Sequence, residues 1–205
     1  MHIQTLAPKT KIVLDRISGQ PFLKSFYLSG GTALALHFGH RESEDLDFFS
    51  KEDFDPSRLQ IELEKVAKLS GVELDKGTLN CHTGSVQLQF LHYPYNLLHH
   101  SIVWNQINLS SVEDIACTKI LTISSRGSKK DFIDLYFILK QYSLNDLFNL
   151  LQKKYPKTDY NQIHLLKSLV YFDDADNQVM PRMHLDVTWD QVKSNIVNTV
   201  KSFKI

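Results

Sequence analysis

Apolar residues follow two different spacings along the chain, and the change of spacing divides the sequence into two halves. Before about residue 110, short apolar runs bounded by glycine or polar turns predict strands with helices between them. From Ser111 onward, apolar residues recur every three or four positions, which is typical of amphipathic helices. We therefore predict an α+β fold, with an α/β core over residues 1–110 and a helical region over residues 111–205.

The first half contains helical and strand patterns in alternation. The helical patterns cover residues 9–17, 32–38 and 57–69, and the strand patterns cover residues 26–28, 46–49, 72–74 and 86–90. Gly30-Gly31 stops the first strand in a tight turn, and Gly39 is a suitable end for the second helix. Residues 86–90 alternate apolar and polar side chains, as strands with one buried face do. Turn signals at Lys76-Gly77 and Thr83-Gly84 lie between the last two strand patterns.

The second half predicts a series of helices joined by short loops. The predicted helices run from Ser111 to about Ser124, over residues 131–141, onward from Ser143, over residues 161–172, and onward from Thr188. Thr188 and Gln191 have the spacing of a capping box, which satisfies free N–H groups at a helix start. Residues 173–176 predict a solvated acidic loop, because no glycine turn or distal glutamate completes a calcium-binding loop.

The composition is that of an ordinary globular protein, with 42% hydrophobic and 22% charged residues among 205, so a packed core is expected. Lys plus Arg equals Asp plus Glu at 23 each, which excludes a global attraction to nucleic acid or to membranes. Cys81 and Cys117 fit no disulfide or zinc framework. With no apolar run of about 20 residues and no signal peptide, we predict a cytoplasmic protein without a membrane partner.

The Gly30-Gly31 turn is the first candidate for chemistry. Glycine lets the backbone approach a phosphate closely, and the helix that follows offers free N–H groups at the positive end of its dipole. Ser29 and Thr32 add hydroxyl donors on either side of the turn. The same pattern on its own also suits a tight turn with no ligand.

Asp45 and Asp47 form the second candidate. On a strand, residues two apart project from the same face, with Cα atoms about 6.6 Å apart. Two carboxylates on one face can hold Mg²⁺ or Mn²⁺, which clamps phosphates in phosphoryl transfer. Taken alone, the pair is more typical of an acidic, solvent-facing strand edge.

The combination of strand, Gly-Gly, helix and Asp-x-Asp strand resembles the DNA polymerase β-like nucleotidyltransferase superfamily. The segments 30–36 and 39–49, which include Arg41 and Ser43, are similar to its AbiEii/AbiGii toxin-like branch. The resemblance implies a nucleotidyltransferase-fold mixed sheet flanked by helices, with the helical region completing the active-site cleft. It implies Mg²⁺-dependent transfer of an NMP from an NTP to a hydroxyl acceptor, either an RNA end such as that of tRNA or a protein. It also implies a toxin of a toxin–antitoxin or abortive-infection system, with a cognate antitoxin as partner, and places Arg41 and Ser43 at the nucleotide.

A basic stretch after the boundary supports the resemblance. Lys119 on the first predicted helix of the second half can neutralise triphosphate charge and is a candidate catalytic residue. Arg126, Lys129 and Lys130 form a local basic patch, in which Arg126 and Lys129 are expected to bind phosphate. The resemblance makes Asp131 a functional acid near the nucleotide. Without the resemblance, a basic loop before an acidic helix start, which suits the helix dipole, is the better interpretation.

The chain departs from the superfamily pattern at one position. A third acid, which serves as general base and metal ligand, is expected on the strand at residues 86–90, where Gln89 stands instead. An amide cannot accept a proton. Asp131, Glu44 or His92 could replace the missing base, or the protein could be a non-catalytic nucleotide-binding module on the same fold. A purely structural domain, without nucleotide affinity, is the third hypothesis.

Overall fold

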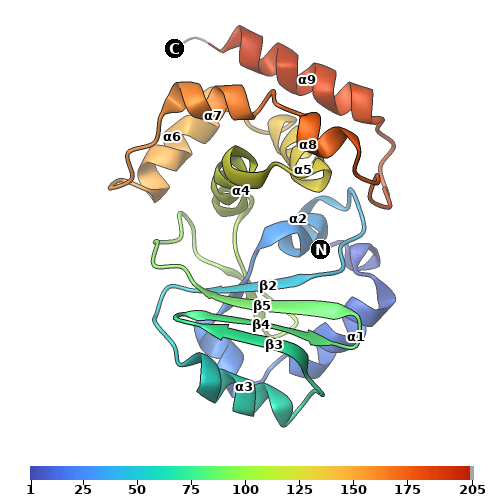
Figure 1. Cartoon of the computed structure of the whole chain (residues 1–205), viewed down its shortest axis with the longest axis vertical. Coiled ribbons are helices and arrows are strands. Elements are labelled where there is room, and N and C mark those ends of the chain that lie inside the picture. The colour runs from blue at the N-terminus through green and yellow to red at the C-terminus, as the bar shows by residue number, and fades with distance from the viewer. Residues whose placement is uncertain (204–205) are drawn as a thin grey trace. The chain divides into compact units, whose positions relative to one another are not determined.

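A computed structural model describes residues 1–203 of the chain (Figure 1). The chain divides into two compact units, Met1–Ser111 and Val112–Ile205. Within the described residues, every strand lies in the first unit and the second unit is helical. The predicted α+β class and the mixed sheet flanked by helices are therefore confirmed. That the second unit completes an active-site cleft stays a prediction.

The first unit builds one mixed sheet with helices between its strands. Its helices are η1 (Ile3–Thr5), α1 (Pro8–Ile17), η2 (Pro21–Ser25), α2 (Gly30–Phe38) and α3 (Pro56–Glu64), of which η1 and η2 are 3-10 helices. Its strands are β1 (Tyr27–Leu28), β2 (Leu46–Ser50), β3 (Ser70–Asp75), β4 (Thr78–Thr83), β5 (Val86–His92), β6 (Ile102–Trp104) and β7 (Ile107–Leu109).

The seven strands follow the order β3-β4-β5-β2-β1-β7-β6. β2 pairs in parallel with β5 and β1 pairs in parallel with β7, whereas the other neighbours are antiparallel. Figure 1 shows β2, β5, β4 and β3 side by side in this order. This topology places β2, which carries Asp47, in the middle of the sheet, so the backbone of Asp47 is fixed by paired strands on both sides.

The two faces of this sheet differ because the sequence alternates along its strands. On β2, Leu46 and Phe48 are fully buried, whereas Asp47 and Phe49 are half-buried. Phe48 stacks on Phe90 of β5 with ring centroids 5.1 Å apart. Burying one such side chain contributes about 1.5–3 kcal/mol, so the apolar positions fix the face from which Asp47 projects.

The second unit is a set of helices around α4. Its helices are α4 (Val112–Arg126), α5 (Lys129–Leu139), α6 (Leu144–Lys154), α7 (Gln162–Ser168), α8 (Asp173–Asp176) and α9 (Trp189–Ser202). α4 packs against α5, α6 and α7, and α5 packs against α9. The Lys154 ammonium lies 2.6 Å from the Asp114 carboxylate, which joins α6 to α4 through a buried ion pair. Across residues 1–203, none of the helices has the length and hydropathy that crossing a membrane requires.

Most predicted helices and strands are observed, and the differences have local causes. The helix predicted to residue 69 ends at Glu64, because β3 begins at Ser70 and the chain must turn before it. The acidic segment 173–176, predicted as a loop, is the helical turn α8, whose Ala175 is fully buried. β4, β6 and β7 were not predicted; β4 occupies the stretch between the two turn signals.

Candidate active site in the first unit

The Gly-Gly turn brings a carboxylate against the start of a helix. α2 begins at Gly30, directly after β1, with a backbone φ of +64° that L-residues rarely adopt. A Cβ added at Gly30 would lie 2.3 Å from the Asp47 Oδ2 atom. Only glycine therefore allows both this backbone conformation and this approach, and the pattern Gly-Gly…Asp-x-Asp has a direct geometric basis.

Arg41 contributes a cation to the same turn. A Cβ at Gly31 would lie 2.5 Å from its Nη2 atom, so the guanidinium packs over the first turn of α2. Arg41 is only 3% exposed, and its Nη1 donates to the Glu42 carbonyl at 3.0 Å. The side chain of Ser29, the N-cap residue, makes no capping hydrogen bond to α2. The helix start and the guanidinium together can bind a phosphate.

The hydroxyl groups of Ser29 and Thr32, predicted to donate to phosphates, have partners inside the fold. Ser110 Oγ donates to Ser29 Oγ at 2.9 Å. Thr32 Oγ1 is within hydrogen-bonding distance of Ser43 Oγ, at 2.8 Å, and of the Asp45 carbonyl. Thr32 is 1% exposed, so its hydroxyl connects α2 to the segment that leads into β2. The contact fixes the backbone of Asp45 and thereby the direction in which its carboxylate projects.

Asp45 and Asp47 are the predicted metal ligands and offer the carboxylate oxygens that Mg²⁺ prefers. Asp45 immediately precedes β2, whereas Asp47 lies on it. Both are half-buried, and Asp47 lies at the helix start described above. Within residues 1–203 there is no group of three or more His, Cys, Asp or Glu side chains placed to hold a metal. Mg²⁺ is commonly bound by one or two carboxylates together with water and substrate phosphates, so two carboxylates suffice only with a nucleotide present.

The position of the missing third acid lies directly beside Asp47. The parallel register of β2 and β5 pairs Asp47 with Gln89, the residue that the resemblance aligns with the third acid. His92, considered as an alternative base, pairs with Ser50. Because side chains alternate between faces, His92 projects from the face opposite Asp47, and the hypothesis that it replaces the base is wrong.

Lys119, predicted to neutralise phosphate charge, belongs to a buried cluster in the second unit. Its Nζ lies 2.7 Å from Asp131 Oδ1 and 2.7 Å from Asp134 Oδ2. Two carboxylates and one ammonium give the cluster a net charge of −1, so the lysine charge is already compensated. Burial raises the pKa of Asp131, but the Lys119 charge and hydrogen bonds from Lys119 and Ser128 outweigh it and leave the pKa below its ordinary value. A carboxylate with a lowered pKa is a poor general base.

The predicted basic patch is only partly present. The Lys129 ammonium donates to the Asp176 carbonyl at 3.1 Å and to the Gln178 carbonyl, and lies 5.1 Å from the centroid of the Trp189 ring. These contacts are sufficient to stabilise the buried Lys129 ammonium, and no phosphate is needed to explain its position. Arg126 is exposed and lines a cavity of about 360 Å³ in the second unit. The catalytic role of Lys119 and Asp131 and the phosphate-binding role of Arg126 stay predictions.

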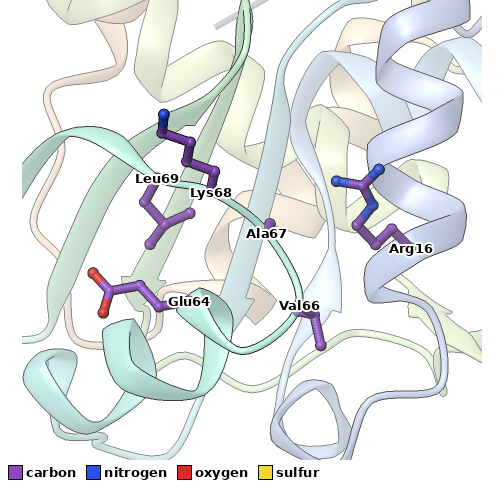
Figure 2. Close-up of a pocket in the computed structure, with 6 residues that line it drawn as sticks. All are labelled: Arg16, Glu64, Val66, Ala67, Lys68 and Leu69. Atoms are coloured by element: carbon purple, nitrogen blue, oxygen red, sulfur yellow. The ribbon is translucent and has the colours of Figure 1, made fainter.

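A separate cavity of about 510 Å³ lies between α1 and the segment that follows α3 (Figure 2). It is lined by Arg16, Glu64, Val66, Ala67, Lys68 and Leu69. Figure 2 shows the charged side chains of Arg16, Glu64 and Lys68 projecting from different segments rather than toward one point. None of the predicted site residues lines this cavity, which therefore does not extend the candidate site.

The sequence did not predict Asn80, a polar residue on the strand next to Gln89. Gln89 Nε2 donates to Asn80 Oδ1 of β4 at 2.9 Å. A signal for β4 was present, because residues 78–83 alternate apolar and polar side chains up to the final threonine.

A helix that starts at Gly-Gly, beside a strand of a mixed sheet that carries Asp47 and directly follows Asp45, matches the nucleotidyltransferase class of folds. Solved structures agree with this class. A candidate nucleotidyltransferase from H. pylori shares 16% identity over 95% of this chain and 94% of its own, with a TM-score of 0.57. MenT4, a nucleotidyltransferase toxin from Mycobacterium tuberculosis, shares 14% identity over 94% of this chain and 81% of its own, with a TM-score of 0.56.

The chain belongs to the AbiEii nucleotidyltransferase toxin family. The family model described as "Nucleotidyl transferase AbiEii toxin, Type IV TA system" matches residues 12–99, which contain both the Gly-Gly turn and the Asp-x-Asp strand. An uncharacterized protein of Aquifex aeolicus (strain VF5) is 32% identical over 207 residues, which cover 98% of each chain.

Proposed function

We propose that the protein transfers a nucleoside monophosphate from an NTP to a hydroxyl acceptor. The observation that carries this proposal is the contact of the Asp47 carboxylate with Gly30 at the start of α2. It brings a metal-binding group and a phosphate-binding helix start together within one unit. Membership of a nucleotidyltransferase toxin family supports the same activity.

In the proposed reaction, Asp45 and Asp47 hold Mg²⁺, which neutralises negative charge on the triphosphate when bound. Arg41 and the first N–H groups of α2 orient the phosphates. The acceptor oxygen forms a bond to the α-phosphorus while the bond to the β-phosphate oxygen breaks, and pyrophosphate leaves. The amide at Gln89 cannot take the hydroxyl proton, which passes to water.

The test is incubation of the protein with α-labelled NTPs, Mg²⁺ and either an RNA pool or a protein lysate. Wild type should transfer label, whereas Asp45→Asn and Asp47→Asn should lower transfer by at least about 100-fold, as removal of an essential charge-stabilising group does. Asp75→Asn is the matched control, because this acid is exposed at the end of β3. Equal labelling by wild type and the Asp47→Asn variant would reject the proposal.

The family description supports a toxic role, which we propose for this chain as well. Its expression in a bacterial host should slow growth, and Asp45→Asn should restore it at equal protein level. A gene encoding the cognate antitoxin should relieve the growth defect of wild type. Growth inhibition that persists in the Asp45→Asn variant would separate toxicity from nucleotidyl transfer.

A non-catalytic nucleotide-binding module is the second candidate function, and Gln89 is the observation that favours it. Its amide stands beside Asp47, where the superfamily pattern has a carboxylate. This candidate predicts that NTP binding, measured by calorimetry, is retained while no label is transferred by wild type. It also predicts that Gln89→Asp gains transfer activity, because a carboxylate restores both the charge and the proton acceptor.

A further inference from the structure

A row of polar side chains crosses four neighbouring strands of the first unit. The strand registers pair Asp47 on β2 with Gln89 on β5, Gln89 with Asn80 on β4, and Asn80 with Glu73 on β3. Residues paired across strands project from the same face. The order of these strands can be followed in Figure 1. The row therefore begins at a proposed metal ligand and continues away from it along one face of the sheet.

The two amides in the middle of the row form a pair. Gln89 Nε2 donates to Asn80 Oδ1 at 2.9 Å, and both residues are half-buried. Across residues 1–203, their side-chain amides make no other hydrogen bond. The pair therefore retains the Gln89 Oε1 atom as an acceptor and the Asn80 Nδ2 group as a donor. An acceptor and a donor side by side are complementary to the edge of a nucleobase.

The residues around the amide pair suit a base better than a phosphate. One row further along the strands, the register pairs Phe49 with Leu91, and both are half-buried on the same face as Asp47 and Gln89. Aromatic and apolar side chains bind the flat surface of a base by stacking. No lysine or arginine belongs to either row. A phosphate would find no cation among these side chains.

We propose that Gln89 and Asn80 bind the base edge of the acceptor's terminal nucleotide and thereby select the end that is extended. The inference rests on the proposed function, because it places the acceptor hydroxyl at Asp45 and Asp47. Adjacent strands lie about 4.8 Å apart, so Gln89 and Asn80 are one and two strand spacings from Asp47. This is the reach of one nucleoside from its sugar hydroxyl to its base. Gln89 is then a specificity-determining residue rather than a substituted acid, and the acceptor is a nucleic acid.

The experiment measures binding without transfer. Four short single-stranded RNAs that differ only in the 3′-terminal base are titrated with the full-length protein in Mg²⁺ without NTP, and Kd is read from fluorescence anisotropy. Wild type should bind the best end about 10-fold more tightly than the worst, as expected for one amide-read base. Gln89→Ala and Asn80→Ala should each reduce the ratio between the weakest and the tightest Kd to about twofold or less.

Two further variants separate base recognition from structural effects. Gln89→Glu keeps the length of the side chain but cannot donate to Asn80, and should also lose the discrimination. Gln87→Ala is the matched control, because this exposed amide lies two residues away on the same face of β5, and it should retain the full spread. Retained discrimination in Gln87→Ala also shows that an alanine on this strand leaves the sheet intact.

Equal Kd values for the four RNAs with wild type, or discrimination that survives in both Gln89→Ala and Asn80→Ala, would overturn the inference. Label transfer to proteins but not to RNA would overturn it as well. Wild type that discriminates among the ends, loses discrimination in the two variants and yet transfers no label would support the amide pair and reject nucleotidyl transfer. The two proposals can therefore fail separately.

Discussion

The Asp47 carboxylate lies against the α-carbon of Gly30, so closely that a Cβ at Gly30 would be 2.3 Å from Asp47 Oδ2. Gly30 starts a helix and Asp47 lies in the middle of the neighbouring strand. A phosphate bound at the helix start and a metal ion bound at the carboxylate would thus lie next to each other. The distance between these two residues is the geometric condition for the proposed chemistry.

Gly30→Ala should disrupt this contact. The backbone φ of +64° costs an alanine about 1–2 kcal/mol, and the added methyl group also displaces the Asp47 carboxylate. We expect a loss of stability of that size or more in urea denaturation, and a loss of NTP binding and transfer of at least about 10-fold.

Gly84→Ala is the matched control for this substitution. Gly84 has a nearly identical φ of +62°, but a Cβ there meets no atom within 4 Å. It should lose about 1–2 kcal/mol of stability and keep its NTP affinity. If both variants bound NTP as weakly as each other, backbone strain rather than contact with Asp47 would explain the effect.

Thr32→Val tests whether the buried hydroxyl positions Asp45. The substitution keeps the branched shape but removes the hydrogen bonds to Ser43 Oγ and to the Asp45 carbonyl. An unsatisfied buried acceptor costs about 1–3 kcal/mol, which urea denaturation would detect. Mg²⁺-dependent NTP binding should weaken in parallel, and Thr32→Ser should restore both. A Thr32→Val variant with full stability and affinity would show that the contact is incidental.

Asp131 should make stability dependent on pH in the acid range. Its folded pKa lies below the ordinary value of 3.8, because the Lys119 charge and hydrogen bonds outweigh the effect of burial. The unfolded chain therefore binds the proton at a higher pH than the folded one. The resulting stabilisation is complete above the unfolded pKa, about 3.9, and is lost as pH falls through the folded pKa. Asp131→Asn should show a shallower loss of unfolding free energy between about pH 5 and pH 3.

Asp146→Asn provides the comparison for Asp131→Asn. Asp131 closes a capping box with Ser128 at the start of α5, and Asp146 closes the equivalent box with Ser143 on α6. Hydrogen bonds from Ser143 lower the pKa of Asp146, but this residue is exposed and no lysine contributes to the shift. The slope of stability against pH should change less in this variant. An equal change in both variants would assign the effect to the capping box and not to Lys119.

Part of the site could be predicted, because the residues that form it lie close together in the sequence. Gly30-Gly31 starts a helix, and Asp45 and Asp47 flank a buried leucine, so strand and helix periodicity already place them. Their mutual approach depends on the register of β1 with β2, which no local pattern contains. The alternation of residues 78–83 could have indicated the strand that carries Asn80, but not its pairing with Gln89, which gives Asn80 its importance.

The roles of the charged residues were harder to predict than their positions. Lys129 was expected to contact a phosphate, yet its ammonium is used by carbonyl groups near residue 177, almost fifty residues later. Lys119 was expected to present a positive charge, yet two carboxylates compensate it. A charged side chain takes its partner from tertiary structure, so a basic segment predicts that partners exist but not which they are.

Lys154→Met should be among the most damaging substitutions outside the candidate site. The Lys154 ammonium and Asp114 carboxylate are 2.6 Å apart, with side chains 1% and 2% exposed. Removing the ammonium leaves a buried carboxylate without this charge, which costs about 3–5 kcal/mol, whereas replacing both partners by apolar residues is often neutral. In urea denaturation, the double variant Lys154→Met and Asp114→Leu should therefore be more stable than Lys154→Met alone. Lys11→Met, which breaks the exposed pair with Asp15, should cost less than about 1 kcal/mol. Equal losses for Lys154→Met and Lys11→Met would show that burial adds nothing to the pair.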